Sequence, residues 1–249
     1  MCPGAAAASI GGMTINQIPG RWVEGTGLVL GPLLLLAAVL VRMGEDDFFP
    51  GQLAAYAADP AKMVVSYSLF AAGVVLLWPA VAALTRMIAA TRPGWAAWGG
   101  TLVVLGLFGR VFHAGASHLA FRMVDALGPA AAQQAVSSTY GAFHVFKAAN
   151  VAIMGGWIVL AIGAYRARAF GPGIGGTARC VALALASGLP LGVLKGSTDP
   201  ISLVALAGLA VALVPLGVAL SREGPAPRWW AVVLTVALIP AAFVAGLSG

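Results

Sequence analysis

Residues 63–84 read MVVSYSLFAAGVVLLWPAVAAL, and this stretch decides the fold because it carries no charged side chain from end to end. Roughly 20 consecutive apolar residues in a helix span the ~30 Å hydrocarbon core of a bilayer. The segment therefore predicts a transmembrane helix.

Further apolar windows of similar length flank this stretch on both sides. They lie at 23–41, 96–119, 141–164, 178–194, 201–220 and 229–247. We expect an all-α, polytopic membrane bundle of seven transmembrane helices. The windows at 178–194 and 201–220 are the weakest, so six helices is the alternative. Residues 1–20 are predicted to be a flexible N-terminal tail, and residues 21–249 a single transmembrane helical domain.

The composition supports a membrane location. Of the 249 residues, 60% are hydrophobic and 9% are charged, and the mean hydropathy is +0.94. This leaves too little polar surface to cover a soluble domain, so the lipid bilayer is the expected partner. The net charge of +6 does not indicate nucleic-acid binding, because the basic residues sit mainly between apolar runs. The sequence identifies no protein partner.

The distribution of charged residues predicts the orientation in the membrane. One side of the predicted bundle carries Arg21, Arg86, Arg92, Arg166, Arg168, Arg179, Arg222 and Arg228. The other side carries Arg42, Lys62, Arg122 and Lys195 together with Glu45, Asp46, Asp47, Asp59, Asp125 and Asp199. Cytoplasmic loops are enriched in Lys and Arg. We therefore expect a multi-pass plasma-membrane protein with a cytoplasmic N-terminus and an outer C-terminus.

Two predicted helices carry polar stripes. At 100° per residue, one face of the third helix holds Arg110, His113, Ser117 and Phe121. One face of the fourth holds Tyr140, His144, Lys147 and Met154, with Asn150 at its edge. Ionisable groups inside a span are costly and usually face the bundle interior, so the stripes predict a shared polar pocket. In the alternative, Arg122 and Lys147 reach towards the interface and the histidines only join neighbouring helices.

No metal or cofactor is expected. His113 and His118 are five residues apart, which separates their directions on a helix by about 140°. The HExxH spacing of zinc enzymes does not occur, and Cys2 and Cys180 form no CxxC motif. The pair Asp46-Asp47 lacks the second carboxylate that a DDxxD-type magnesium site requires.

The chain resembles two groups of membrane proteins. Its Ala/Gly/Leu-rich spans, an early acidic loop and the segment RPGWAAWGGTLVVLG at 92–106 resemble actinobacterial membrane proteins of unknown function. Its length, helix count and acidic residues near helix ends are similar to those of the seven-helix integral membrane terpene cyclases of bacterial indole sesquiterpenoid and fungal meroterpenoid pathways. The second resemblance covers the chain at the level of topology.

The cyclase resemblance implies a metal-free enzyme of secondary metabolism that protonates and cyclises a linear prenylated substrate. The candidate acids are Asp46, Asp47, Asp125 and Asp199, with His113 or His144 orienting the acid or accepting the final proton. Arg110 and Lys147 would hold a polar or anionic end of the substrate. The other candidate contacts are Asn150, Tyr140, Phe112 and Trp78, the aromatic ones facing the carbocation.

Two other functions remain open from the sequence. In a transporter or exporter of a small anionic or lipophilic compound, Arg110, Lys147 and Lys195 would form the binding site. In a noncatalytic membrane scaffold, the same polar residues would only join helices. A lipophilic small molecule is thus an expected partner of a cyclase or a transporter. No such partner is expected for a scaffold.

Overall fold

The computed structural model describes residues 20–46, 49–140, 145–189 and 200–223, with isolated positions between 226 and 241. Within these residues the regular secondary structure is helical throughout, which confirms the predicted all-α class. The helices are α1 (Arg21–Val41), α2 (Gly51–Ala58), α3 (Pro60–Ala89), α4 (Pro93–Leu127), α5 (Pro129–Tyr140), α6 (Phe146–Ala167), α7 (Gly173–Leu185), η1 (Ala186–Gly188) and α9 (Pro200–Arg222).

Five of the described helices are long and apolar enough to cross a membrane, and they indicate a membrane protein. They are α1, α3, α4, the Ala148–Ala167 part of α6, and α9, and they match five of the predicted windows. The window at 178–194 covers most of α7, whose 13 residues reach only ~20 Å. That window continues into 190–199, which lie outside the described residues, and the window at 229–247 is described only at isolated positions.

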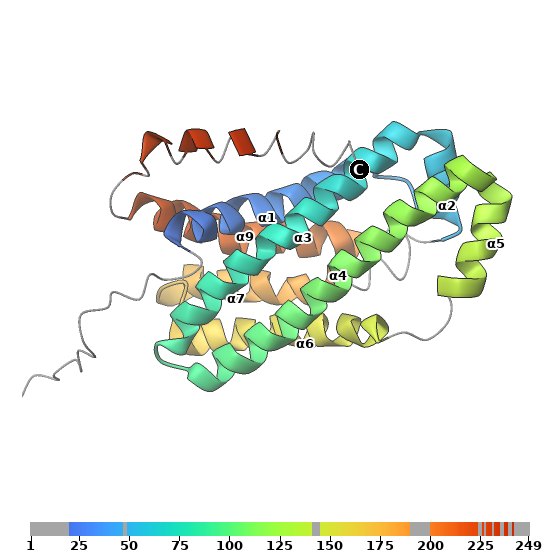
Figure 1. Ribbon diagram of the computed structural model, residues 1–249. Helices are drawn as coiled ribbons and strands as arrows, with labels where there is room; N and C mark the ends of the chain where they lie inside the picture. The colour runs from blue at the N-terminus through green and yellow to red at the C-terminus, as the bar shows by residue number, and fades with distance from the viewer. Residues whose placement is uncertain are drawn as a thin grey trace, which may run out of the picture.

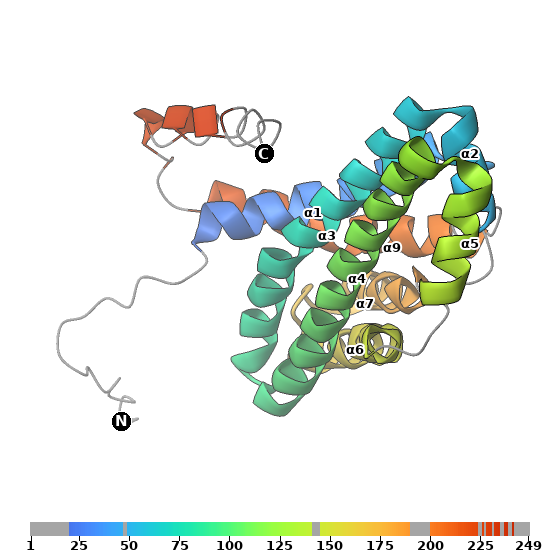
Figure 2. The same cartoon turned by 45° about the vertical axis from the view of Figure 1, so that its right-hand side comes forward.

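The five long helices and the shorter α7 form a closed ring. Helix α1 packs on α3, α3 on α4, α4 on α6, α6 on α7 and α7 on α9, and α9 returns to α1. Successive members of the ring run in opposite directions (Figures 1 and 2). Each helix therefore presents one face to a common interior and another to the surroundings.

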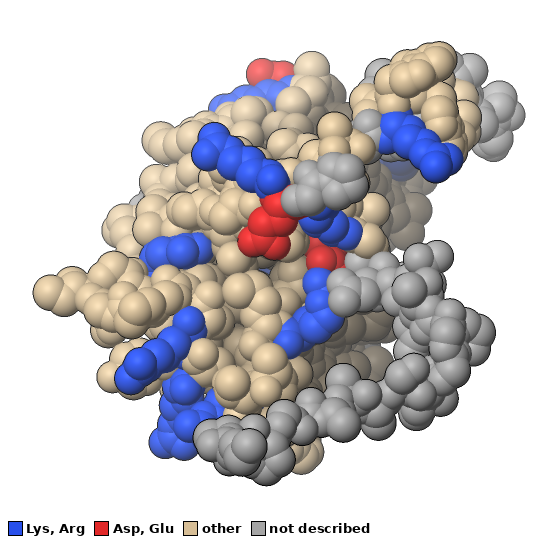
Figure 3. Space-filling model, turned by 90° about the vertical axis from the view of Figure 1, so that its left-hand side faces the viewer, with Lys and Arg blue, Asp and Glu red and all other residues tan. Residues whose placement is uncertain are grey.

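The two ends of the ring differ in charge. At one end α1 begins, α3 ends and α4 begins, and basic side chains, all of them arginines by the sequence, gather there (Figure 3). We call this the basic end. Arg179 lies inside α7, not in the loop before it, and donates hydrogen bonds of 2.7 and 3.2 Å to the carbonyl of Ala212 on α9. It therefore links two helices of the ring.

The opposite end carries a small cap made by α2 and α5. Helix α4 has 35 residues and is ~52 Å long, which exceeds the thickness of a bilayer. Its last turns, with Phe121 and Val124, pack with Tyr56 of α2 and Val136 of α5 in a second buried cluster. We call this the cap end, and the cap extends the fold beyond the apolar core.

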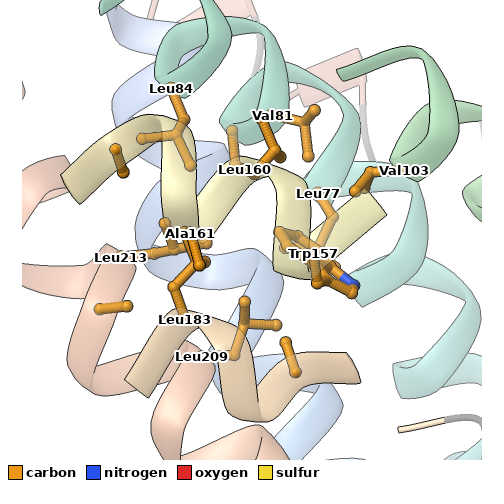
Figure 4. Close-up of a cluster of buried hydrophobic side chains, with 14 of the residues drawn as sticks. Leu77, Val81, Leu84, Val103, Trp157, Leu160, Ala161, Leu183, Leu209 and Leu213 are labelled. Atoms are coloured by element: carbon orange, nitrogen blue, oxygen red, sulfur yellow. The ribbon is translucent and has the colours of Figure 1, made fainter. Parts of the chain in front are cut away.

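The half of the ring towards the basic end is tightly packed. Leu84, Leu160, Leu183, Leu209 and Leu213, from α3, α6, α7 and α9, are at most 1% exposed (Figure 4). Buried aliphatic side chains of this density leave no room for solvent. The ring is therefore closed on this side.

Close approach of α4 and α6 depends on glycine. A Cβ atom at Gly156 would lie 2.7 Å from the backbone nitrogen of Val103. A Cβ atom at Gly106 would likewise overlap Ile153. Small residues let membrane helices pack backbone to backbone, so these glycines set the spacing of the two helices that carry the predicted polar stripes.

Candidate functional site

A small cavity lies inside the ring, nearer to the cap end than to the basic end. Its volume is about 30 Å³, enough for roughly two groups of the size of a water molecule. The described lining residues come from α1 and the residue after it, α3, α4, α6, the residue after η1, and α9: Leu35, Val39, Arg42, Phe70, Val74, Leu77, Leu107, Arg110, Ile153, Trp157, Leu189 and Ser202. Every helix of the ring except α7 therefore borders the cavity.

Arg42 enters the cavity from the end of α1, and its side chain is only 3% exposed. It donates a 3.3 Å hydrogen bond to Oγ of Ser66, which in turn donates a 2.7 Å bond to the carbonyl of Ala38. The guanidinium carbon lies 5.0 Å from the ring centre of Tyr67 and 5.6 Å from that of Phe70. Both distances are typical of cation–π contacts, so Arg42 is held in place from α3.

Arg110 enters the cavity from the middle of α4 and is 7% exposed. Its Nη2 donates a hydrogen bond to Oδ1 of Asn150 on α6. The structure thus brings together two of the residues that the polar stripes place in a pocket. Ser117 and Phe121 on the same face of α4 are also buried, as expected for a stripe that faces the interior.

Trp157 of α6 contributes a polar group that has no hydrogen-bond partner in the described part of the chain. The side chain is fully buried and lines the cavity, and its indole Nε1 makes no hydrogen bond to any described residue. Figure 4 shows this nitrogen on the side of the ring turned away from Leu160 and Ala161. An unsatisfied buried donor costs about 1–3 kcal/mol. This makes the N–H a marker for a ligand in the cavity.

The polar groups of the lining are mostly donors. Guanidinium and indole groups donate hydrogen bonds and accept none, and Ser202 on α9 adds a hydroxyl. None of the described lining residues of this cavity is acidic. Donors in an apolar enclosure favour an anionic ligand. The volume of about 30 Å³ is far below the roughly 300–1,000 Å³ of pockets for drug-sized molecules.

The described candidate acids lie away from this cavity. Asp46 is exposed between α1 and α2. Asp125 is 45% exposed; it accepts hydrogen bonds of 2.8 and 2.9 Å from the hydroxyl of Tyr56 and pairs with Arg122 at 3.0 Å. Burial and the hydrogen bond to Asp125 raise the pKa of Tyr56. These contacts fasten α2 to α4 within the cap.

The remaining predicted site residues fall into two groups. His113, Phe112 and Trp78 are described but do not line the cavity. Phe112 stacks on Phe146 at 4.2 Å and lies 5.6 Å from the His113 ring, whereas Trp78 lies in an open groove between α3 and α4. Outside the described residues or side chains are Asp47, Asp199, His144, Lys195, Tyr140 and Lys147.

Two buried charges were missed by the sequence analysis as site residues. Arg42 was counted as a loop charge because it follows the apolar window at 23–41. Glu24 lies within that window, 1% exposed, and pairs with Arg86 of α3. The sequence signal for Glu24 was a charged residue inside an apolar window. The sequence held no comparable signal for Arg42, because Arg42 follows the window.

Comparison with known proteins adds no assignment. No family model, curated protein or solved structure matches this chain. Among the described residues, no three His, Cys, Asp or Glu side chains are grouped as metal ligands would be. The geometry of the cavity is therefore the main indication of function.

Proposed function

We propose that this chain is a membrane protein that binds a small anion between Arg42 and Arg110 and acts as a transporter or exporter for it. The observation that carries the proposal is that two arginines, 3% and 7% exposed, line one cavity together with Trp157, whose buried N–H has no hydrogen-bond partner among the described residues. Ionisable residues inside membrane bundles are expensive and mark substrate pathways. A scaffold would need neither the cavity nor the unpartnered donor.

Transport requires the ring to open on each side in turn. The described state is closed towards the basic end by the leucines of Figure 4. Three neighbouring helices each contain an internal proline: Pro32 in α1, Pro79 in α3 and Pro215 in α9. Proline removes a backbone hydrogen bond and lets a helix bend. These positions are where α1, α3 and α9 would flex to release an anion.

Substitution of the two arginines tests the proposal. The measurement is anion binding and flux by purified protein in liposomes, for wild type, Arg42→Gln, Arg110→Gln and the double variant. Hydrogen bonds to charged groups contribute about 1.5–3 kcal/mol, so each single variant should bind roughly 10- to 100-fold more weakly. Arg122→Gln is the matched control, because the Arg122 side chain is 73% exposed on the cap. A folded double variant with wild-type binding would exclude this site.

We also propose seven spans, a cytoplasmic N-terminus and an outer C-terminus in the plasma membrane. The support is the concentration of arginine side chains at the basic end (Figure 3), which matches the positive-inside rule. Reporter fusions after Arg92 and at Gly249 test the topology. Seven spans place these two reporters on opposite sides of the membrane, whereas six spans place both on the cytoplasmic side.

Terpene cyclisation is a second candidate, favoured by the aromatic rings of Phe70 and Trp157 in the cavity wall. It requires the cavity to widen severalfold and a carboxyl group to reach it. The test is expression in a host that makes a linear farnesylated acceptor, with Asp46→Asn, Asp47→Asn, Asp125→Asn and Asp199→Asn as variants. A new isomer of unchanged mass that is lost in one variant supports a cyclase. An intact protein that forms no isomer argues against it.

A further inference from the structure

We infer that the cavity selects weakly hydrated monovalent anions, such as bromide and nitrate, over strongly hydrated multivalent anions such as sulfate. This inference rests on the proposed anion site and specifies its ligand class. Three features of the cavity lead to it: the apolar wall, the kind of donor that the wall presents, and the volume.

The wall forces an entering ion to lose its water. Most of the lining consists of aliphatic side chains: Leu35, Val39, Val74, Leu77, Leu107, Ile153 and Leu189. The Born cost of moving an ion out of water rises with the square of its charge. A divalent anion therefore loses about four times as much hydration free energy as a monovalent ion of the same radius. The aliphatic side chains of the wall form no hydrogen bonds with the ion, so they do not offset the lost hydration free energy.

The donors that replace water are few and weakly hydrated themselves. A guanidinium is more weakly hydrated than an ammonium group and stacks on aromatic rings, as Arg42 does over Tyr67. Arg42 and Arg110 already have partners within the protein, Ser66 and Asn150 among them, so only part of their donor capacity faces a ligand. Such a set can stabilise a diffuse single charge. It cannot replace the full hydration shell of sulfate.

Trp157 supplies an uncharged hydrogen-bond donor for the anion. The Trp157 side chain lines the cavity, and its buried indole N–H has no hydrogen-bond partner among the described residues. A neutral donor adds a short-range hydrogen bond to an anion without adding another charge. The Trp157→Phe substitution keeps an aromatic ring and removes only this donor among the polar groups. It therefore isolates the contribution of the N–H.

The volume sets an upper limit on the ligand. About 30 Å³ holds roughly two groups of the size of a water molecule. A bare halide or nitrate ion is of this order of size. Sulfate accompanied by part of its water shell is larger.

The experiment measures binding of sodium nitrate, bromide and sulfate to the full chain in nanodiscs by titration calorimetry at fixed ionic strength. We expect nitrate and bromide to bind at least 10-fold more tightly than sulfate. The Trp157→Phe variant should bind nitrate about 10-fold more weakly, since a hydrogen bond to a charged group contributes about 1.5 kcal/mol or more. The matched control is Trp98→Phe, because Trp98 is 70% exposed on α4. Thermal unfolding verifies that each variant is folded.

The outcomes separate this inference from the proposed function. Sulfate that binds as tightly as nitrate, with both lost in the Arg42→Gln/Arg110→Gln variant, would overturn the selectivity and keep the anion site. A folded Trp157→Phe variant with wild-type affinity would overturn the role of the indole N–H. Folded wild-type protein that binds none of these anions would overturn the proposed function itself.

Discussion

The carboxylate of Glu24, in the first turn of α1, accepts hydrogen bonds on both oxygens from the guanidinium of Arg86 in the last turns of α3. Glu24 is 1% exposed, whereas the Arg86 side chain is 40% exposed. The pair therefore joins two neighbouring helices close to the basic end, with the acid in the interior and the base reaching outwards. A buried charge needs such a partner to offset its lost hydration.

Breaking this pair should destabilise the bundle. Removing one partner of a buried ion pair costs about 3–5 kcal/mol, and the partial exposure of Arg86 places the Arg86→Gln and Glu24→Gln variants near the lower end. The Glu24→Gln/Arg86→Gln double variant should lose less than the sum of the single losses. Equilibrium unfolding in detergent measures all three. Glu223→Gln, an exposed acid after α9, is the control, and additive single losses would show that the pair is uncoupled.

The adjacent glycines Gly155 and Gly156 of α6 differ in how closely α4 approaches them. A Cβ atom at Gly156 would lie 2.7 Å from the Val103 backbone nitrogen, whereas one at Gly155 would meet nothing within 4 Å. Gly156→Ala should therefore lower the free energy of unfolding by about 1–3 kcal/mol through overpacking. Gly155→Ala should leave it unchanged or raise it slightly, because alanine favours the helix. Equal melting temperatures for the two variants would contradict the close approach of these helices.

The cap should weaken at alkaline pH. The pKa of Tyr56 is raised above its ordinary value of 10.0, first by burial and then by the hydrogen bond to Asp125. A raised pKa in the folded state gives stability that is complete below pH 10 and is lost as pH rises through the folded pKa. Wild type should therefore melt higher than Tyr56→Phe at pH 8, and the difference should shrink above pH 10. Melting curves from pH 8 to 11 measure it, and a constant difference would contradict the prediction.

Most of the fold follows from apolar periodicity and length. The windows at 63–84 and 201–220 coincide with α3 and α9 because an uncharged run of that length has one low-energy arrangement in lipid. Helix α7 is harder to predict, because a short helix is stabilised by its neighbours and not by its own length. The contact of α9 with α1, which closes the ring, depends on tertiary packing. No local sequence pattern predicts it.

The site was predictable only along single helices. The stripe on α4 identified Arg110, and the edge of the stripe on α6 identified Asn150, because 100° per residue fixes which residues share a face. Arg42 was not placed in the pocket. Its position depends on how α1, α3 and α6 meet, and no spacing within one helix encodes that arrangement.

Ser66 should act on anion binding through Arg42. Its Oγ accepts a 3.3 Å hydrogen bond from Arg42 and donates a 2.7 Å bond to the carbonyl of Ala38, so it fixes the guanidinium relative to the cavity. Ser66→Ala should weaken nitrate binding about 2- to 10-fold, since a neutral hydrogen bond contributes about 0.5–1.5 kcal/mol. Ser66→Thr keeps the hydroxyl and should restore most of the affinity.

The control for Ser66 is Ser68→Ala on the same helix, since Ser68 is exposed and does not line the cavity. Calorimetric titration of nitrate and a parallel melting curve separate positioning from stability, because positioning changes the affinity more than the melting temperature. If Ser66→Ala lowers only the melting temperature, Ser66 is a packing residue. If Ser66→Ala lowers the affinity and Ser66→Thr restores it, the orientation of Arg42 determines how tightly the cavity holds an anion.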